Sequence, residues 1–174
     1  SDNLGSSVSS AGDFNGDGIS DLAFDDNFSK GLAGRAIIMF GRDDGFAASE
    51  NVETLSDDQG FIINGDTANE RFGVIGRQPG DVNGDGFDDL LIGAFVASPN
   101  GSASGASYVL FGGILNLSAM DSVTSGGGTA GDGRINLDDV NGTTGFVLNG
   151  IAAGDLSGAA VGGAAVGAAM ASSG

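Results

Sequence analysis

Short apolar runs recur along the chain between clusters of Gly, Asp, Asn and Ser. Each run is rich in Val, Ile, Phe or Tyr, which favour β-strands, and each is bounded by residues that favour turns. We therefore predict an all-β chain of short strands. In the central region the predicted strands are Phe61–Asn64, Phe72–Gly76, Asp89–Phe95 and Ala106–Phe111.

Three segments of the chain occur twice, in the same order each time. Asp13–Asp21 matches Asp81–Asp89, Gly34–Gly41 matches Gly105–Gly112, and Gly60–Gly65 matches Gly145–Gly150. A repeat that contains four short antiparallel strands is typical of a propeller blade. Such sheets must pack on one another, because a single one cannot bury its apolar face.

The repeats define the expected domain organisation. We predict an all-β fold of tandem four-stranded antiparallel propeller-blade-like repeats, about two and a half in number and incomplete as a closed ring. Residues 1–59 form a partial N-terminal repeat, 60–113 a complete repeat, 114–144 a Gly-rich insertion, and 145–174 a partial C-terminal repeat without a metal loop. In this division the N-terminal repeat lacks its first strand, and Gly145–Gly150 is a spare one.

The amino-acid composition limits the classes of function that the chain can have. The chain has 34 glycines, a net charge of −17 and a sequence pI of about 4.1. This acidity argues against nucleic acid as a partner, because phosphate binding needs a basic surface. Acidity favours solubility, and clustered Asp residues also supply oxygen ligands for metal ions.

The absence of Cys and His removes most catalytic and redox chemistry. Disulfides, thiolate nucleophiles and the usual imidazole base are all excluded. Adjacent carboxylates such as Asp43 and Asp44 point to opposite faces of a strand, so they do not form an acid–base pair. We therefore expect no enzymatic activity. The most apolar stretch, residues 159–171, is too short and too Gly-rich to span a membrane.

Two loops share the pattern Asp-x-Asn-x-Asp-Gly-x-x-Asp, in which alternate side chains can converge on one cation. Calcium takes six to eight hard oxygen ligands, and Gly at the sixth position permits the sharp turn. We predict two Ca²⁺ sites. The first uses the side chains of Asp13, Asn15, Asp17 and Asp21 with the carbonyl of Ile19, and the second those of Asp81, Asn83, Asp85 and Asp89 with the carbonyl of Phe87.

An EF-hand and a simple hairpin turn are alternatives to this calcium pattern. An EF-hand needs Glu at the twelfth position, where the two loops have Phe24 and Ile92. Simple Asn-Gly and Asp-Gly hairpin turns remain an alternative. A third ion near Asp132 is less favoured than a solvated turn. Sequons for N-glycosylation occur at Asn27, Asn100, Asn116 and Asn141.

The two loops, together with Phe72-Gly73 and Gly93-Ala94, resemble the FG-GAP repeats of integrin α-subunit propellers and their bacterial relatives. The resemblance implies a propeller with calcium in its outward loops and a role in extracellular adhesion or structure. The chain departs from the family at Phe95, where the family has Pro. It departs again at residues 24–26, which read Phe-Asp-Asp in place of Gly-Ala-Pro.

We therefore expect a non-enzymatic, calcium-stabilised structural or adhesive protein of the extracellular space or cell surface. Calcium that binds only the folded chain would stabilise it by mass action. The incomplete terminal repeats favour head-to-tail self-association into a fibre by strand complementation. The alternative is a fragment of a closed integrin-like propeller that binds an extracellular protein or a glycan.

Overall fold

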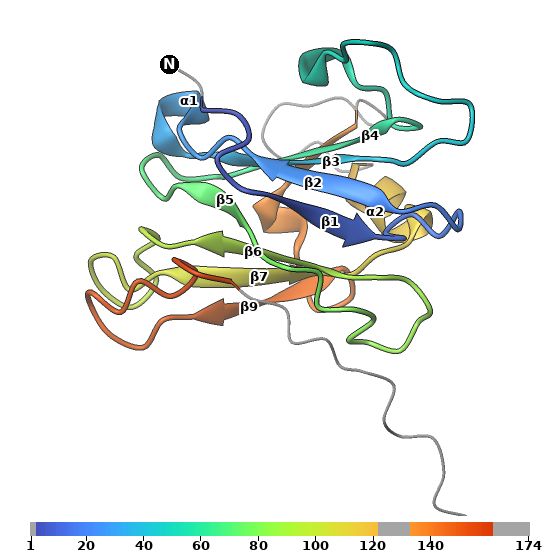
Figure 1. The fold of residues 1–174 in the computed structure, drawn as a ribbon. Helices are drawn as coiled ribbons and strands as arrows, with labels where there is room; N and C mark the ends of the chain where they lie inside the picture. The colour runs from blue at the N-terminus through green and yellow to red at the C-terminus, as the bar shows by residue number, and fades with distance from the viewer. Residues whose placement is uncertain (1–2, 122–132, 162–174) are drawn as a thin grey trace, which may run out of the picture.

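The computed structural model describes residues 3–121 and 133–161, and its strands form two β-sheets that are stacked as layers in Figure 1. The predicted all-β, blade-like fold is confirmed. The first sheet contains, in order, β1 (Val8–Gly12), β2 (Asp21–Asp25), β3 (Arg35–Met39), β4 (Gly60–Asn64) and β8 (Arg134–Asn136). The second contains β5 (Phe72–Ile75), β6 (Leu90–Ala94), β7 (Ala106–Leu110) and β9 (Gly145–Asn149).

Each sheet is built on an antiparallel array of four strands. β1 to β4 follow one another in the chain, whereas the second array contains β5, β6, β7 and β9 and skips β8. Antiparallel neighbours need no crossover connection, so turn-rich loops can join them. In the first sheet β8 joins β4 in parallel, so a strand from the region between the repeats extends that sheet.

Short helices interrupt the β-structure. They are α1 (Ser29–Leu32), α2 (Ile114–Asp121) and the 3₁₀ turns η1 (Val52–Thr54) and η3 (Leu137–Asp139). The region predicted as a Gly-rich insertion thus begins with α2 and also contains β8. The buried Leu117 and Met120 lie three residues apart in α2, a spacing that places them on one face of the helix.

The main core lies between the two sheets and follows from strand alternation. Ile38 and Ile63 of the first sheet and Ile92 and Leu110 of the second belong to one buried cluster. Phe72 is also fully buried there, and its ring meets that of the partly buried Tyr108 edge to face at 5.5 Å. Burial of these side chains between two sheets contributes a favourable free energy of folding that an isolated four-stranded sheet lacks.

The sheets divide the chain at a different place from the predicted repeats. β4, expected to open the repeat at residues 60–113, pairs with β3 and belongs to the first sheet. β9 pairs with β7 over its whole length. The expectations that Gly145–Gly150 is spare and that the N-terminal repeat lacks a strand are therefore wrong. A sequence repeat determines the period, but backbone pairing determines where each sheet begins.

A third repeat begins after β9. It contacts the second sheet in the same way as the second repeat contacts the first sheet. Gly34 forms a parallel bridge with Phe72, and Gly105 forms the equivalent bridge with Ser157. A Cβ on Gly158 would lie 2.2 Å from the carbonyl oxygen of Ala106, so the two backbones are in close contact. Residues 162–174 of the predicted C-terminal repeat lie outside the described residues.

Candidate metal centre

The first loop, residues 13–21, joins β1 to β2 and folds around its first side chain. The Asp13 carboxylate accepts hydrogen bonds from the N–H groups of Gly16 at 2.9 Å and Gly18 at 3.0 Å. Both glycines have positive φ, of 84° and 87°, a conformation that other residues adopt with strain. The glycines therefore allow the backbone to turn around a carboxylate.

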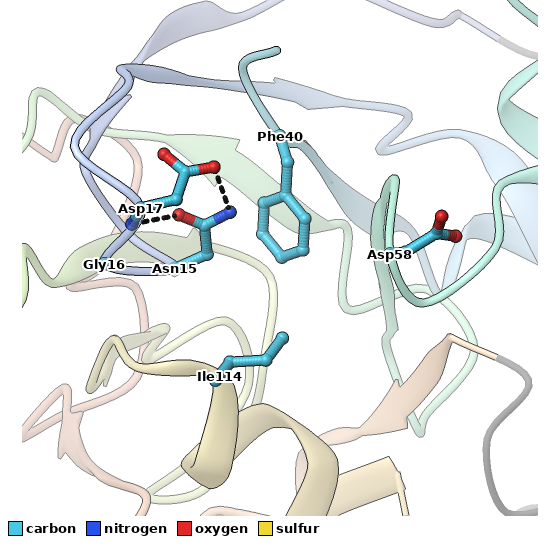
Figure 2. A pocket seen from close by; sticks show the side chains of 6 residues that line it. All are labelled: Asn15, Gly16, Asp17, Phe40, Asp58 and Ile114. Atoms are coloured by element: carbon cyan, nitrogen blue, oxygen red, sulfur yellow. Dashed lines mark hydrogen bonds between the residues drawn. The ribbon is translucent and has the colours of Figure 1, made fainter. Parts of the chain in front are cut away.

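The next two polar side chains continue the same arrangement. Asn15 Oδ1 accepts the N–H of Asp17 at 3.0 Å, and Asp17 Oδ1 accepts the N–H of Ile19 at 2.7 Å. Figure 2 shows Asn15 and Asp17 side by side, with Asn15 Nδ2 also donating to Asp17 Oδ2 at 3.0 Å. Such Asx turns keep alternate side chains close to the loop backbone.

The loop ends on a buried carboxylate. Asp21 Oδ2 accepts the N–H groups of Phe14 at 2.9 Å and Asn15 at 3.2 Å, and Oδ1 accepts that of Gly41 at 2.8 Å. Burial raises the pKa of the Asp21 carboxyl, while these three N–H groups act in the opposite direction. Asp21 thus ties the start of the loop to its end and to the segment after β3.

The second loop, residues 81–89 between β5 and β6, repeats these contacts at equivalent positions. Asp81 accepts N–H groups of Gly84 and Gly86, Asn83 accepts that of Asp85, and Asp85 accepts that of Phe87. Asp89 is fully buried and accepts N–H groups of Val82 at 2.7 Å and Gly112 at 3.0 Å. The two loops therefore share one hydrogen-bonding scheme across the repeat.

The donors suit calcium in their chemistry. Each loop offers carboxylate, amide and carbonyl oxygens, and an ionised carboxylate has about four acceptor sites, more than the loop N–H groups use. Within residues 3–121 and 133–161, however, no three Asp, Glu, His or Cys side chains are gathered as a metal-binding group. The polar side chains instead turn toward loop N–H groups, so both calcium sites stay predictions.

Two cavities adjoin the loops and were not predicted. One, of about 220 Å³, is lined by Asn15, Asp17, Phe40 and Ile114 among others (Figure 2). The other, of about 280 Å³, includes Asp85, Phe87 and Leu115, and Ile114 lines it as well. The start of α2 therefore contributes to a cavity at each loop. The only sequence signal for this contact is the apolar pair that follows Gly113.

An acidic cluster around Asp66 was also missed, because its members lie far apart in the sequence. Asp66 is exposed as a residue, but partial desolvation of its carboxyl, with the charge of Asp138 as the next cause, raises its pKa to about 6. Burial, followed by the charge of Glu70, raises the pKa of Tyr108 to about 12. Asp66 follows β4 and Asp138 lies in η3, so the pairing of β4 with β8 brings them together.

The remaining predicted positions have varied surroundings. Asp132 lies outside the described residues. Among the sequons, Asn27 is buried, whereas Asn141 is exposed in a turn where its side chain accepts the N–H of Thr143 at 3.2 Å. Asn100 Nδ2 donates to the carbonyl oxygen of Gly150 at 2.9 Å. The structure does not describe the side chain of Asn116.

Comparison with known families identifies part of the chain. The FG-GAP repeat family model matches residues 78–110, which contain the second loop, β6 and β7. This match confirms, for these residues, the resemblance seen in the sequence. Such repeats are typically extracellular and typically serve as structural or binding domains without enzymatic activity. No curated protein matches the chain. Among the helices in the described ranges, none is long and apolar enough to cross a membrane.

Proposed function

We propose that this chain is a non-enzymatic structural or adhesive module of the extracellular space or cell surface, stabilised by Ca²⁺ at both loops. The observation that carries the proposal is the shared hydrogen-bonding scheme of residues 13–21 and 81–89. The second of these loops lies inside the FG-GAP match. A scheme preserved across a repeat indicates a common purpose for both loops, beyond a simple hairpin turn.

Each ion would be held by the residues predicted from the loop pattern. The first loop would use the side chains of Asp13, Asn15, Asp17 and Asp21 and the carbonyl of Ile19. The second would use the side chains of Asp81, Asn83, Asp85 and Asp89 and the carbonyl of Phe87. A bound cation would offset the repulsion between the carboxylates of a loop and link that loop to the next strand. Because the chain has no cysteine, such links would replace disulfides as stabilising cross-links.

Thermal unfolding with calcium or with a chelator tests this function. We expect calcium at about 100 times its dissociation constant to add about 2.7 kcal/mol of stability per site, and chelator to remove it. Asp17→Ala and Asp85→Ala should each remove part of the calcium-dependent rise in Tm, and the double variant nearly all of it. Asp43→Ala, an exposed acidic position outside both loops, is the matched control. An unchanged Tm and no bound ion by elemental analysis would reject the proposal.

A second candidate function is head-to-tail self-association. Exposed apolar side chains on the second sheet favour it. By the repeat, Phe146 and Leu148 of β9 are equivalent to Phe61 and Ile63 of β4. Phe61 and Ile63 are buried between the sheets, whereas Phe146 and Leu148 are 39% and 54% exposed. The first sheet of another copy, which exposes Val8, would cover this face much as the second sheet covers the first.

Measurement of the molecular mass over a range of protein concentrations distinguishes self-association from a module that acts as a monomer. Self-association predicts a mass that rises with concentration, rods in electron micrographs, and a return to monomer in Leu148→Glu. Leu115→Glu, at an exposed apolar position on α2, is the control and should still associate. A monomer at every concentration leaves a module that acts singly, such as a part of a closed propeller that binds a protein or glycan ligand.

A further inference from the structure

The two candidate calcium loops touch, although they belong to different repeats. The main chain of Asp13 is held on both sides by Asp88. Asp88 Oδ2 accepts the N–H of Asp13 at 2.9 Å, and the N–H of Asp88 donates to the carbonyl oxygen of Asp13 at 3.3 Å. The first residue of one loop is therefore positioned by the eighth residue of the other.

Close packing reinforces this contact. A Cβ on Gly16 would lie 2.1 Å from a ring carbon of Phe87, and a Cβ on Gly12 would lie 2.2 Å from Asp88 Oδ2. The N–H of Gly113 also donates to the carbonyl oxygen of Phe14 at 2.7 Å. The backbone of the first loop therefore lies directly on side chains of the second, and displacement of either one is opposed by the other.

The contact includes predicted ligands of both ions. Asp13 is the first ligand of the first loop, and Asp88 lies between Phe87 and Asp89, two ligands of the second. Asp88 itself is not a predicted ligand. Its equivalent in the first loop is the exposed Ser20, so the calcium pattern does not explain an acid at residue 88.

We propose that Asp88 is a positioning residue that couples the two loops, so that calcium in one raises the affinity of the other. The inference rests on the proposed calcium sites. An ion in the second loop would fix the backbone on both sides of Asp88, and Asp88 then holds Asp13 ready for the first ion. Thermodynamic linkage makes the effect reciprocal. Coupling between sites is typically about 5- to 150-fold.

Long-range electrostatics acts in the opposite direction. An ion in the second loop cancels negative charge that would attract the first ion. The second loop is largely exposed and the first is partly exposed, however, and salt screens such effects over about 8 Å at physiological ionic strength. The hydrogen-bonded contact is direct, so we expect its effect to exceed the loss of attraction and the coupling to be positive.

Calcium titration of loop variants tests the proposal. Asp85→Ala disables the second loop, and isothermal titration then gives the affinity of the first loop alone. We expect this affinity to fall at least about fivefold below that of the first loop in the unmodified chain. An unchanged or higher affinity would overturn the coupling on its own, whatever happens to the variants at residue 88.

Two substitutions at residue 88 separate charge from hydrogen bonding. Asp88→Asn keeps an oxygen that can accept the N–H of Asp13, and it should retain the coupling. Asp88→Ala removes that oxygen, and the first loop should then bind equally well with and without Asp85→Ala. If the coupling persists in Asp88→Ala, other contacts produce it, and the proposed role of Asp88 is wrong. Ser20→Ala, at the equivalent position of the first loop, is the control and should leave the coupling unchanged.

Failure of this inference is distinguishable from failure of the proposed function. If both loops bind calcium independently, the calcium sites are supported and the coupling is rejected. If neither loop binds calcium in the unmodified chain, both the proposed function and the coupling fall.

Discussion

The guanidinium group of Arg35 donates two hydrogen bonds to Oδ2 of Asp26, from Nε at 3.1 Å and from Nη2 at 2.9 Å. Their side chains are 8% and 0% exposed, so both charges have lost most of their water. Removal of one partner from a buried pair leaves an uncompensated charge. This pair joins the start of β3 to the residue that follows β2.

We predict that Asp26→Ala lowers the free energy of unfolding by about 3 kcal/mol, near the lower end for a buried pair, since Glu53 still contacts Arg35 at 2.6 Å. Urea denaturation measures the change. The partly exposed pair of Arg42 and Glu50 is the control, and Glu50→Ala should cost less than about 1 kcal/mol. Equal effects at the two positions would contradict the importance of burial.

A second prediction concerns Gly34, where the two sheets approach through backbone atoms. Gly34 has φ of 83°, and a Cβ there would lie 2.0 Å from the carbonyl oxygen of Phe72. Gly34→Ala should destabilise the fold through both strain and collision. Gly142 also has φ of 83° but has open space around it, so Gly142→Ala tests strain alone. We expect the larger fall in Tm for Gly34→Ala, and similar falls would mean that the close approach is unimportant.

A third prediction concerns the packing between the sheets. Phe72 is fully buried and lies against Tyr108, so Phe72→Ala should lower stability by about 3–5 kcal/mol. Phe46 is exposed and contacts Arg42 through a cation–π interaction, so Phe46→Ala should cost less than about 1 kcal/mol. Denaturant midpoints give both values. A small effect at Phe72 would show that the sheets do not depend on each other for stability.

A fourth prediction follows from the pKa of Asp66, which is raised from 3.8 to about 6. The folded chain then binds this proton more tightly than the unfolded chain, so ionised Asp66 destabilises the fold above pH 6. This penalty disappears as the pH falls from about 6 to about 4. Asp66→Asn should therefore raise Tm at pH 7 and leave it nearly unchanged near pH 4. If the difference in Tm between Asp66→Asn and the unmodified chain is constant across this pH range, the raised pKa of Asp66 is contradicted.

Local patterns in the sequence were enough to predict the four central strands and both loops. Apolar runs bounded by Gly and Asp correspond to β4, β5, β6 and β7, because strand formation and turn formation depend mainly on neighbouring residues. The loop pattern at residues 81–89 likewise lies within the FG-GAP match. Its spacing, Asp followed by Gly at fixed positions, sets the turn wherever the loop is placed.

The partners of those elements depended on the tertiary structure. β4 joins β3 and β9 joins β7, a choice between equally apolar strands that no local pattern distinguishes. The contact of Asp13 with Asp88 and the cluster around Asp66 each unite residues far apart in the chain. Such contacts form only when burial of apolar side chains between the two sheets brings the repeats together, because the free energy of that burial belongs to the whole fold.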